Sequence, residues 1–193
     1  MLERRLRDAL AATPSAAILH SDVPDIAASH AAVAAAVLIA ITDRAQPGLI
    51  LTQRPTTMRS HAGQVAFPGG RVDDADHDHI AAALREAEEE IALPRSMVRV
   101  IGALSPYHTG TGYEITPIIG VIPPDLVLSA NDDEVSAIFE VPLSFVLDTA
   151  NHQQRETMWM GVPRHYYEMH YDGFRIWGAT AAMIINLGRQ LSW

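Results

Sequence analysis

The strongest hydrophobic pattern in the sequence runs through residues 63–93, where a short apolar segment leads through a glycine turn into one amphipathic helix. At about 100° per residue, the apolar side chains of this helix fall within about 60° of one another: Ile80, Leu84, Ala87 and Ile91. This stripe predicts a helix packed on one side against a core. Since the residue before a proline disfavours helical geometry, Leu93-Pro94 is expected to end it.

The segments around this helix have the lengths and periods of strands and further helices. Helices are expected over residues 1–12, 143–147 and 179–191. Strands are expected over residues 31–42, 49–54, 64–67, 98–104, 115–122, 135–141, 158–162, 165–171 and 174–177, with 158–162 and 165–171 joined as a hairpin. Residues 105–113 are expected to form a loop. This order of elements predicts the α/β class, as an α/β/α sandwich with a mixed β-sheet.

Length and composition favour a single globular domain. The chain has 193 residues, of which 48% are hydrophobic and 19% charged, enough to bury a sizeable core. Residues 1–30 are expected to form an N-terminal helix and coil extension, and residues 31–193 the main domain. The longest apolar run, residues 31–41, is too short for a bilayer span, and the N-terminus lacks the apolar core of a signal peptide. A cytoplasmic protein without a membrane partner is expected.

The charged residues narrow the chemistry further. There is no cysteine, which excludes disulfides, thiol nucleophiles and cysteine-ligated metals. All 14 basic residues are Arg, so Schiff-base catalysis and the lysine of a Walker loop are also excluded. The net charge of −9 argues against a nucleic acid polymer as partner, because no basic stripe is available to bind it.

One surface of the central helix concentrates acidic side chains. Glu86 lies three residues before Glu89 and four before Glu90, and Arg85 lies four before Glu89. Like charges at this spacing repel by about 0.2–0.5 kcal/mol per pair. A hard divalent cation with oxygen ligands would turn that repulsion into binding. Taken alone, such a cluster is more often a solvated acidic face than a metal site.

The same stretch resembles the Nudix box, whose signature is G-x5-E-x7-R-E-U-x-E-E-x-G-U with U an aliphatic residue. Residues 85–90, Arg-Glu-Ala-Glu-Glu-Glu, supply the R-E-U-x-E-E core. Gly70 matches the opening glycine, and Asp76 stands where the first acid belongs. Two positions depart from the signature: eight residues instead of seven separate Asp76 from Arg85, and Ala92 replaces the second glycine.

The segment before the box is similar to one branch of this family, the coenzyme A pyrophosphatases (CoA diphosphatases). The residues that carry this resemblance are Leu51-Thr52-Gln53-Arg54, Arg59, Gly63 and Phe67-Pro68-Gly69-Gly70, with Thr116-Pro117 after the box. Boxes of this branch also tolerate the longer spacing. The resemblance covers roughly residues 31–187 and is strongest over residues 50–93.

The resemblance implies a hydrolase that uses Mg²⁺ or Mn²⁺ to cut a pyrophosphate linkage with water. Glu86 and Glu90 would then be metal ligands, and Glu89 a third ligand or the base that orients water. Arg85 would hold Glu89 in place. The implied substrate is coenzyme A, cleaved to 3′,5′-ADP and 4′-phosphopantetheine. The alternatives are a Nudix hydrolase of ADP-ribose or a nucleotide sugar, and a non-catalytic module that binds a nucleotide without cleaving it.

Substrate contacts are expected from residues before the central helix. Gly69 and Gly70 permit close approach of the backbone to a ligand, and Arg54 or Arg59 would meet the 3′-phosphate of coenzyme A. Either arginine could instead be a structural cation. The acidic cluster at residues 132–134 is a candidate outer metal ligand or a solvated turn. A homodimer is left open.

Overall fold

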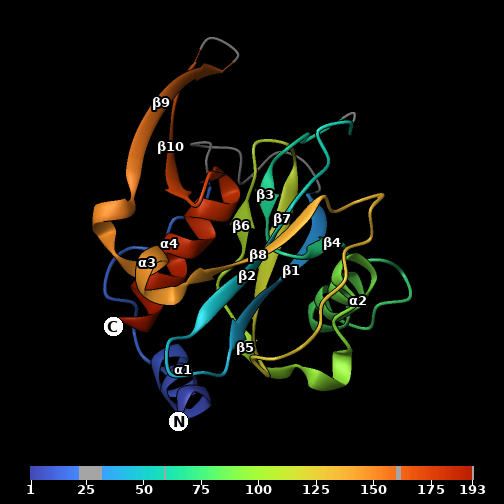
Figure 1. The fold of residues 1–193 in the computed structure, drawn as a ribbon. Helices are drawn as coiled ribbons and strands as arrows, with labels where there is room; N and C mark the ends of the chain where they lie inside the picture. The colour runs from blue at the N-terminus through green and yellow to red at the C-terminus, as the bar shows by residue number, and fades with distance from the viewer. Residues whose placement is uncertain (22–31, 59, 160–161, 193) are drawn as a thin grey trace.

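The computed structural model describes residues 1–21, 32–58, 60–159 and 162–192, and their fold is shown in Figure 1. The helices are α1 (Leu2–Ala11), α2 (His79–Ile91), α3 (Leu143–Leu147) and α4 (Ala179–Leu191), with 3₁₀ turns η2 (Arg95–Met97) and η3 (Thr149–Asn151). All four helices lie within a residue or two of their predicted positions. The chain is therefore of the α/β class, as expected.

Two sheets form the framework of the molecule. The larger has eight strands: β1 (Val33–Thr42), β2 (Gly48–Gln53), β3 (Val65–Ala66), β4 (Gly69–Arg71), β5 (Arg99–Ala103), β6 (Tyr107–His108), β7 (Tyr113–Ile122) and β8 (Ala137–Pro142). Its main order is β3-β2-β1-β7-β5, with β4 paired to β1, β6 to β7 and β8 to β2. Because β1 and β7 are parallel while β1 and β2 are antiparallel, the predicted mixed sheet is confirmed.

Helices cover both faces of this sheet, which gives the three layers of the predicted sandwich (Figure 1). Helix α2 packs on one face, where it shares a core cluster with Leu38 and Ile118. Helices α1, α3 and α4 pack on the other face, against residues that include Ile39 and Leu51. Strand β1 is buried over its last eight positions because helices lie on both of its sides.

A second sheet has the strand order β11-β10-β9, formed by β9 (Gln153–Trp159), β10 (Val162–Tyr171) and β11 (Phe174–Trp177). The β9–β10 hairpin projects from the body of the molecule (Figure 1). Phe174 of β11 stacks on Phe139 of β8, with ring centroids 3.8 Å apart and planes 5° apart. This contact joins the small sheet to an edge of the large one.

Three predicted elements need correction. The hairpin strands were expected at residues 158–162 and 165–171, but Trp159 pairs with Val162, so the hairpin turns within the first expected strand. Strand β4 occupies part of the expected glycine turn because its backbone pairs with β1. Strand β6 lies in the expected 105–113 loop and pairs with β7. Strands of two or three residues are too short to show a hydrophobic period in a sequence.

The N-terminal segment is bound to the core. Leu2 and Leu6 of α1 are buried in the cluster formed with α4. Beyond α1, Leu19 exchanges two 2.8 Å hydrogen bonds with the Asn186 side chain, donating through its N–H and accepting through its carbonyl. No helix in the described part of the chain is long and apolar enough to cross a membrane.

Candidate active site

Helix α2 is placed close to the sheet by small side chains. It begins at Asp78, whose Oδ1 accepts a 2.7 Å hydrogen bond from the Ala81 N–H. The stripe that the sequence predicts is right for Ala87 and Ile91, which are fully buried, and only partly right for Ile80 and Leu84, which are half-buried. Their place at the centre of the interface is taken by Ala82 and Ala83. The alanines let the helix backbone approach β1 closely.

The helix ends in an unusual conformation for its sequence. Ala92 has φ 52° and ψ 32°, in the left-handed region that favours glycine. Its N–H still donates to the carbonyls of Ala87 and Glu88, which closes the last turn. The alanine therefore occupies the conformation expected of the second glycine of the motif, so this departure from the signature leaves the backbone path intact.

The paired glycines of β4 bring that strand against the acidic side chains of α2. A Cβ at Gly70 would lie 2.3 Å from Oε1 of Glu86, and a Cβ at Gly69 would lie 2.4 Å from the Ala36 carbonyl oxygen. The Gly69 N–H also donates a 3.2 Å hydrogen bond to Oε2 of Glu90. The sequence predicts that these glycines permit close approach. In the structure, the carboxylates of Glu86 and Glu90 approach the two glycines.

Arg85 is surrounded by oxygen acceptors. Its Nη2 lies 2.9 Å from Oδ2 of Asp76, and its Nη1 lies 3.0 Å from Oε1 of Glu86 and 3.0 Å from Oε2 of Glu89. Nη2 also donates to the Arg71 carbonyl at 3.0 Å. The predicted contact with Glu89 is present. The contact between Arg85 and Asp76 was not predicted from the sequence. The position of Asp76 as the first acid of the motif could have indicated it.

The ionisation of these groups follows from their contacts. Hydrogen bonding to Arg85 lowers the pKa of Asp76 below its usual value, despite the burial of that carboxyl. The bond to Asp76 in turn raises the pKa of Arg85. Arg85 is thus a permanently charged centre with its donors already occupied, an arrangement that suits holding carboxylates in place.

Glu90 is far more buried than the helical pattern suggests. Its exposed fraction is 3%, so the expectation that it lies on an exposed face is wrong. The helical pattern was misleading because β4 covers this part of the helix. Burial raises the pKa of Glu90 to about 7, with the Gly69 hydrogen bond acting in the opposite direction. Burial also raises the pKa of Glu86, against the influence of Arg85. Burial therefore disfavours the charged form of both groups more than their basic partners favour it.

Two other segments reach this site. Arg54 Nη1 lies 4.0 Å from Oε1 of Glu90, and Arg54 Nε is buried with no hydrogen-bond partner in the described structure. The acidic turn at residues 131–134 is attached to α2, since the Asn131 N–H donates to the Glu90 carbonyl at 2.9 Å. The charge of Glu134 contributes to the raised pKa of both Glu86 and Glu90. Arg59, the other predicted substrate contact, lies outside the described residues.

The donor set fits a hard divalent cation in its chemistry. It consists of carboxylate oxygens, the ligands that Mg²⁺ and similar ions prefer. No three carboxylate or histidine side chains of the described residues converge into a ready-made metal cluster. Arg85 lies between Glu86 and Glu89, while Glu90 turns toward Gly69. An ion held by all three glutamates would therefore require side-chain rotation at one or more of them.

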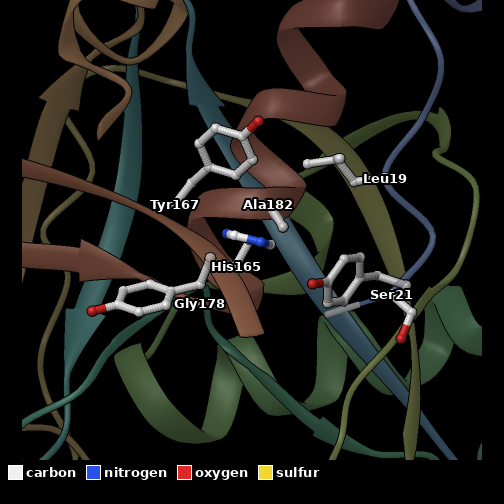
Figure 2. A pocket seen from close by; sticks show the side chains of 8 residues that line it. Leu19, Ser21, His165, Tyr167, Gly178 and Ala182 are labelled. Atoms are coloured by element: carbon white, nitrogen blue, oxygen red, sulfur yellow. The ribbon is translucent and has the colours of Figure 1, made fainter. Parts of the chain in front are cut away.

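A narrow cavity lies elsewhere in the structure (Figure 2). It has a volume of about 40 Å³ and lies between α4, the β9–β10 hairpin and the segment at residues 19–21. Its lining includes Tyr107, His165 and Tyr167. None of the predicted site residues lines it.

The comparisons with known proteins all indicate the same family. A sequence profile of the NUDIX domain matches residues 32–169. The protein named uncharacterized Nudix hydrolase NudL, from Escherichia coli O7:K1, is 52% identical over 157 residues, covering 81% of this chain and 82% of the relative. The same named protein of Escherichia coli strain K12 is equally similar.

Solved structures share the fold at low sequence identity. A Nudix hydrolase from M. Smegmatis, RenU, aligns with a TM-score of 0.50 at 21% identity, covering 60% of this chain and 74% of that one. A MutT/nudix family protein from Enterococcus faecalis aligns with a TM-score of 0.51 at 14% identity, covering 86% of this chain and 63% of that one.

Proposed function

Because this chain belongs to the Nudix hydrolase family and is a pyrophosphohydrolase, we propose that its substrate is coenzyme A, cleaved at the diphosphate to 3′,5′-ADP and 4′-phosphopantetheine. The observation that carries the site assignment is the packing of Glu86 and Glu90 against the Gly69-Gly70 backbone. Both carboxyls have pKa values raised by burial, so a cation beside them would stabilise their charged forms.

Nudix hydrolases generally use divalent metal ions, and we propose Mg²⁺ or Mn²⁺ for this protein. Glu86, Glu89 and Glu90 would hold the ion. When bound, it would neutralise charge on the diphosphate and lower the pKa of water. Glu89, whose side chain is 54% exposed, is the one of the three with most freedom to orient water as a base.

The other residues of the site position these groups. Arg85 bonds Asp76 on one side and Glu86 and Glu89 on the other, so it fixes the carboxylates relative to β4. Gly70 leaves the space that the Glu86 carboxylate fills. Arg54 brings a guanidinium beside Glu90 with one N–H donor unused. The positive charge of this guanidinium suits a phosphate group of the substrate.

The choice of coenzyme A depends on the residues before the box, from Leu51 to Gly70, and on the longer spacing between Asp76 and Arg85. Coenzyme A carries a 3′-phosphate that ADP-ribose lacks. In a protein of net charge −9 this phosphate requires its own basic contact. Arg54 and Arg59 are the candidates. The closeness of Arg54 to Glu90 suits it better to the diphosphate, which leaves Arg59 for the 3′-phosphate.

The test is a substrate panel with Mg²⁺ or Mn²⁺: coenzyme A, its 3′-dephospho form, ADP-ribose, NADH and diadenosine polyphosphates, with products identified by mass spectrometry. Coenzyme A should have the highest kcat/KM, and Arg59→Ala should erase the preference over 3′-dephospho-coenzyme A without abolishing hydrolysis. Equal rates for the two forms, or a preference for ADP-ribose, would reject this substrate while retaining the metal chemistry. Binding without cleavage of any panel member would favour a non-catalytic module.

We further propose a cytoplasmic location, in keeping with a small-molecule substrate and without a membrane or nucleic acid partner.

A further inference from the structure

The cavity shown in Figure 2 is built from parts of the chain that are distant in sequence. It has a volume of about 40 Å³. Apolar atoms come from Leu19 and Ala182, while Ser21, Tyr107 and Tyr167 contribute hydroxyl-bearing side chains. His165 also lines it, and because its side chain is 60% exposed, we place it at the mouth. The cavity is thus narrow, partly apolar and edged by polar groups.

The wall formed by residues 19–21 is fixed in place. Leu19 is bound through both backbone groups to Asn186 of α4. The His20 carbonyl accepts a 2.8 Å hydrogen bond from the His108 N–H, and Ser21 forms a parallel bridge with His108. These contacts tie the segment to α4 and to β6 at once. The cavity is therefore a built feature of the fold.

The strand register connects this cavity to the acidic site. Arg71 of β4 pairs with Ala35 of β1, Ala35 pairs with Ile115 of β7, and Ile115 pairs with Tyr107 of β6. These four residues therefore form one row across the sheet, on the face that α4 covers. With neighbouring strands about 4.8 Å apart, the row places Tyr107 about 14 Å from Arg71.

Arg71 marks the end of the row nearest the acidic site. It follows Gly70, the residue whose missing Cβ makes room for Glu86. Its side chain is exposed and donates to the Tyr113 hydroxyl from Nε at 3.1 Å and from Nη2 at 2.7 Å. Because that partner is neutral and Arg71 forms no ion pair within the described part of the chain, its charge can meet a phosphate.

We propose that this cavity receives the distal end of the substrate's slender, amide-linked arm, which would be the pantetheine arm of coenzyme A. This inference rests on the proposed function. Bound at the acidic site near Arg71, the diphosphate would lie about 14 Å from Tyr107. An extended amide-linked chain spans this distance in about four peptide-like units, at about 3.5 Å each.

The size of the cavity decides between the two ends of the substrate. A cavity needs about 10–15 Å³ to hold one water molecule, so a volume of about 40 Å³ suits the end of a thin chain and is too small for a purine. The lining suits the same end, since Leu19 and Ala182 can contact methylene groups. The nucleotide half then lies outside this cavity.

Three variants test the assignment. Ala182→Val fills part of the cavity with a larger side chain, and His165→Ala removes the side chain at its mouth. His170→Ala is the matched control, because it lies on the same strand but on the opposite face, where it contacts Glu168. Each variant is measured for the KM of coenzyme A, and by calorimetry for binding of the two products separately. Thermal melting checks that each variant is folded.

The proposal predicts that Ala182→Val raises the KM of coenzyme A about tenfold or more and weakens 4′-phosphopantetheine binding in parallel. His165→Ala should act in the same direction by a few-fold, with 3′,5′-ADP binding unchanged in both variants and both ligands unaffected by His170→Ala. Weakened 3′,5′-ADP binding in place of 4′-phosphopantetheine binding would place the nucleotide in the cavity and overturn the proposal.

Failure of this proposal can be told apart from failure of the proposed function. Unchanged KM and product binding in both cavity variants, with coenzyme A still hydrolysed, would remove the subsite and leave the enzyme activity standing. A wild-type protein that does not hydrolyse coenzyme A would reject the proposed substrate and this subsite with it. If Ala182→Val does not fold, His165→Ala and its control decide the matter alone.

Discussion

The fold buries Glu90, although burying a charged carboxylate is costly. Its side chain is almost completely buried. It accepts one hydrogen bond from the Gly69 N–H and lies 4.0 Å from the Arg54 guanidinium. Burial raises its pKa to about 7. A group in this environment is costly to ionise without a nearby cation. We infer that function, and not stability, keeps a carboxylate at this position.

The first prediction concerns the proposed metal ligands. Glu86→Gln and Glu90→Gln should each lower kcat by about 10²-fold or more, because each loses a charged oxygen ligand. Thermal stability in a chelator should stay level or rise, because a carboxylate that burial and neighbouring acids disfavour is removed. Glu88→Gln is the control, since Glu88 lies on the same helix and bonds Arg95 at 2.7 Å. Wild-type turnover in both ligand variants would end the assignment.

The second prediction concerns Arg85. Its substitution by Ala should lower kcat, because Glu86 and Glu89 lose the guanidinium that fixes them, while KM should change little. Lys should restore only part of the activity, since it cannot reproduce the planar fork that spans Asp76 and the two glutamates. Arg95→Ala is the control. A strong rise in KM with kcat intact would instead make Arg85 a phosphate ligand.

At the scale of elements, β4 and α2 form the unit that makes the site. The ten residues from Asp76 to Arg85 bring the first acid of the motif back to the helical arginine, even though one residue is inserted relative to the common spacing. The helix, its acids and its arginine were predictable from the sequence because they repeat at helical spacing. Strand β4 was not, because Gly-Gly-Arg has no hydrophobic period and is held by pairing with β1.

The β9–β10 hairpin is held to β11 by a buried carboxylate. Glu168 of β10 is 5% exposed and bonds Arg155 of β9 at 2.7 Å and Arg175 of β11 at 2.8 Å. Hydrogen bonding to Arg155, followed by that to Arg175, lowers the pKa of Glu168 to about 2. Side-chain contacts thus join the three strands. The alternating hydrophobic and polar pattern of the sequence does not reveal these contacts.

The third prediction follows from this shift. Because the pKa of Glu168 is lower in the folded chain than in the unfolded one, its stabilisation is present above about pH 4.5 and is lost as pH falls toward 2. The shift corresponds to at most about 3 kcal/mol. Urea unfolding between pH 2 and 7 should show a shallower acid loss in Glu168→Gln and a lower stability at pH 7. Glu156→Gln, on the exposed part of the hairpin, should keep the wild-type slope.

At the scale of the whole molecule, sequence patterns predicted the three layers correctly, but they did not predict the contacts between the layers. Apolar segments predicted strands and helices, and the mixed sheet followed from their order. The burial of Glu90 and the contact of Arg54 with it depend on where β2, β4 and α2 meet in space. A helical pattern assigns a side chain to a face of its own helix and cannot show which strand later covers that face. The division of residues 1–30 from the main domain stays a prediction, although α1 packs into the shared core.

The two halves of the proposed substrate site lie on opposite faces of the same sheet edge. Gly70 faces α2 and the carboxylates, while Arg71 lies on the face that α4 covers. A diphosphate at this edge could keep its phosphorus atoms beside Glu86 and Glu90 and send one arm along the other face. The strand register thus relates the chemistry at α2 to the cavity at α4.

Hydrolysis of coenzyme A in ¹⁸O-labelled water, followed by mass spectrometry of the products, tests the central claim most directly. With Mg²⁺ or Mn²⁺ present, the wild-type protein should yield 3′,5′-ADP and 4′-phosphopantetheine, one of them carrying a single ¹⁸O atom on its phosphate. The reaction should stop when the metal is chelated and should be lost in Glu86→Gln. Unabated cleavage under chelation, or in that variant, would contradict the assignment of diphosphate hydrolysis to the carboxylates of α2.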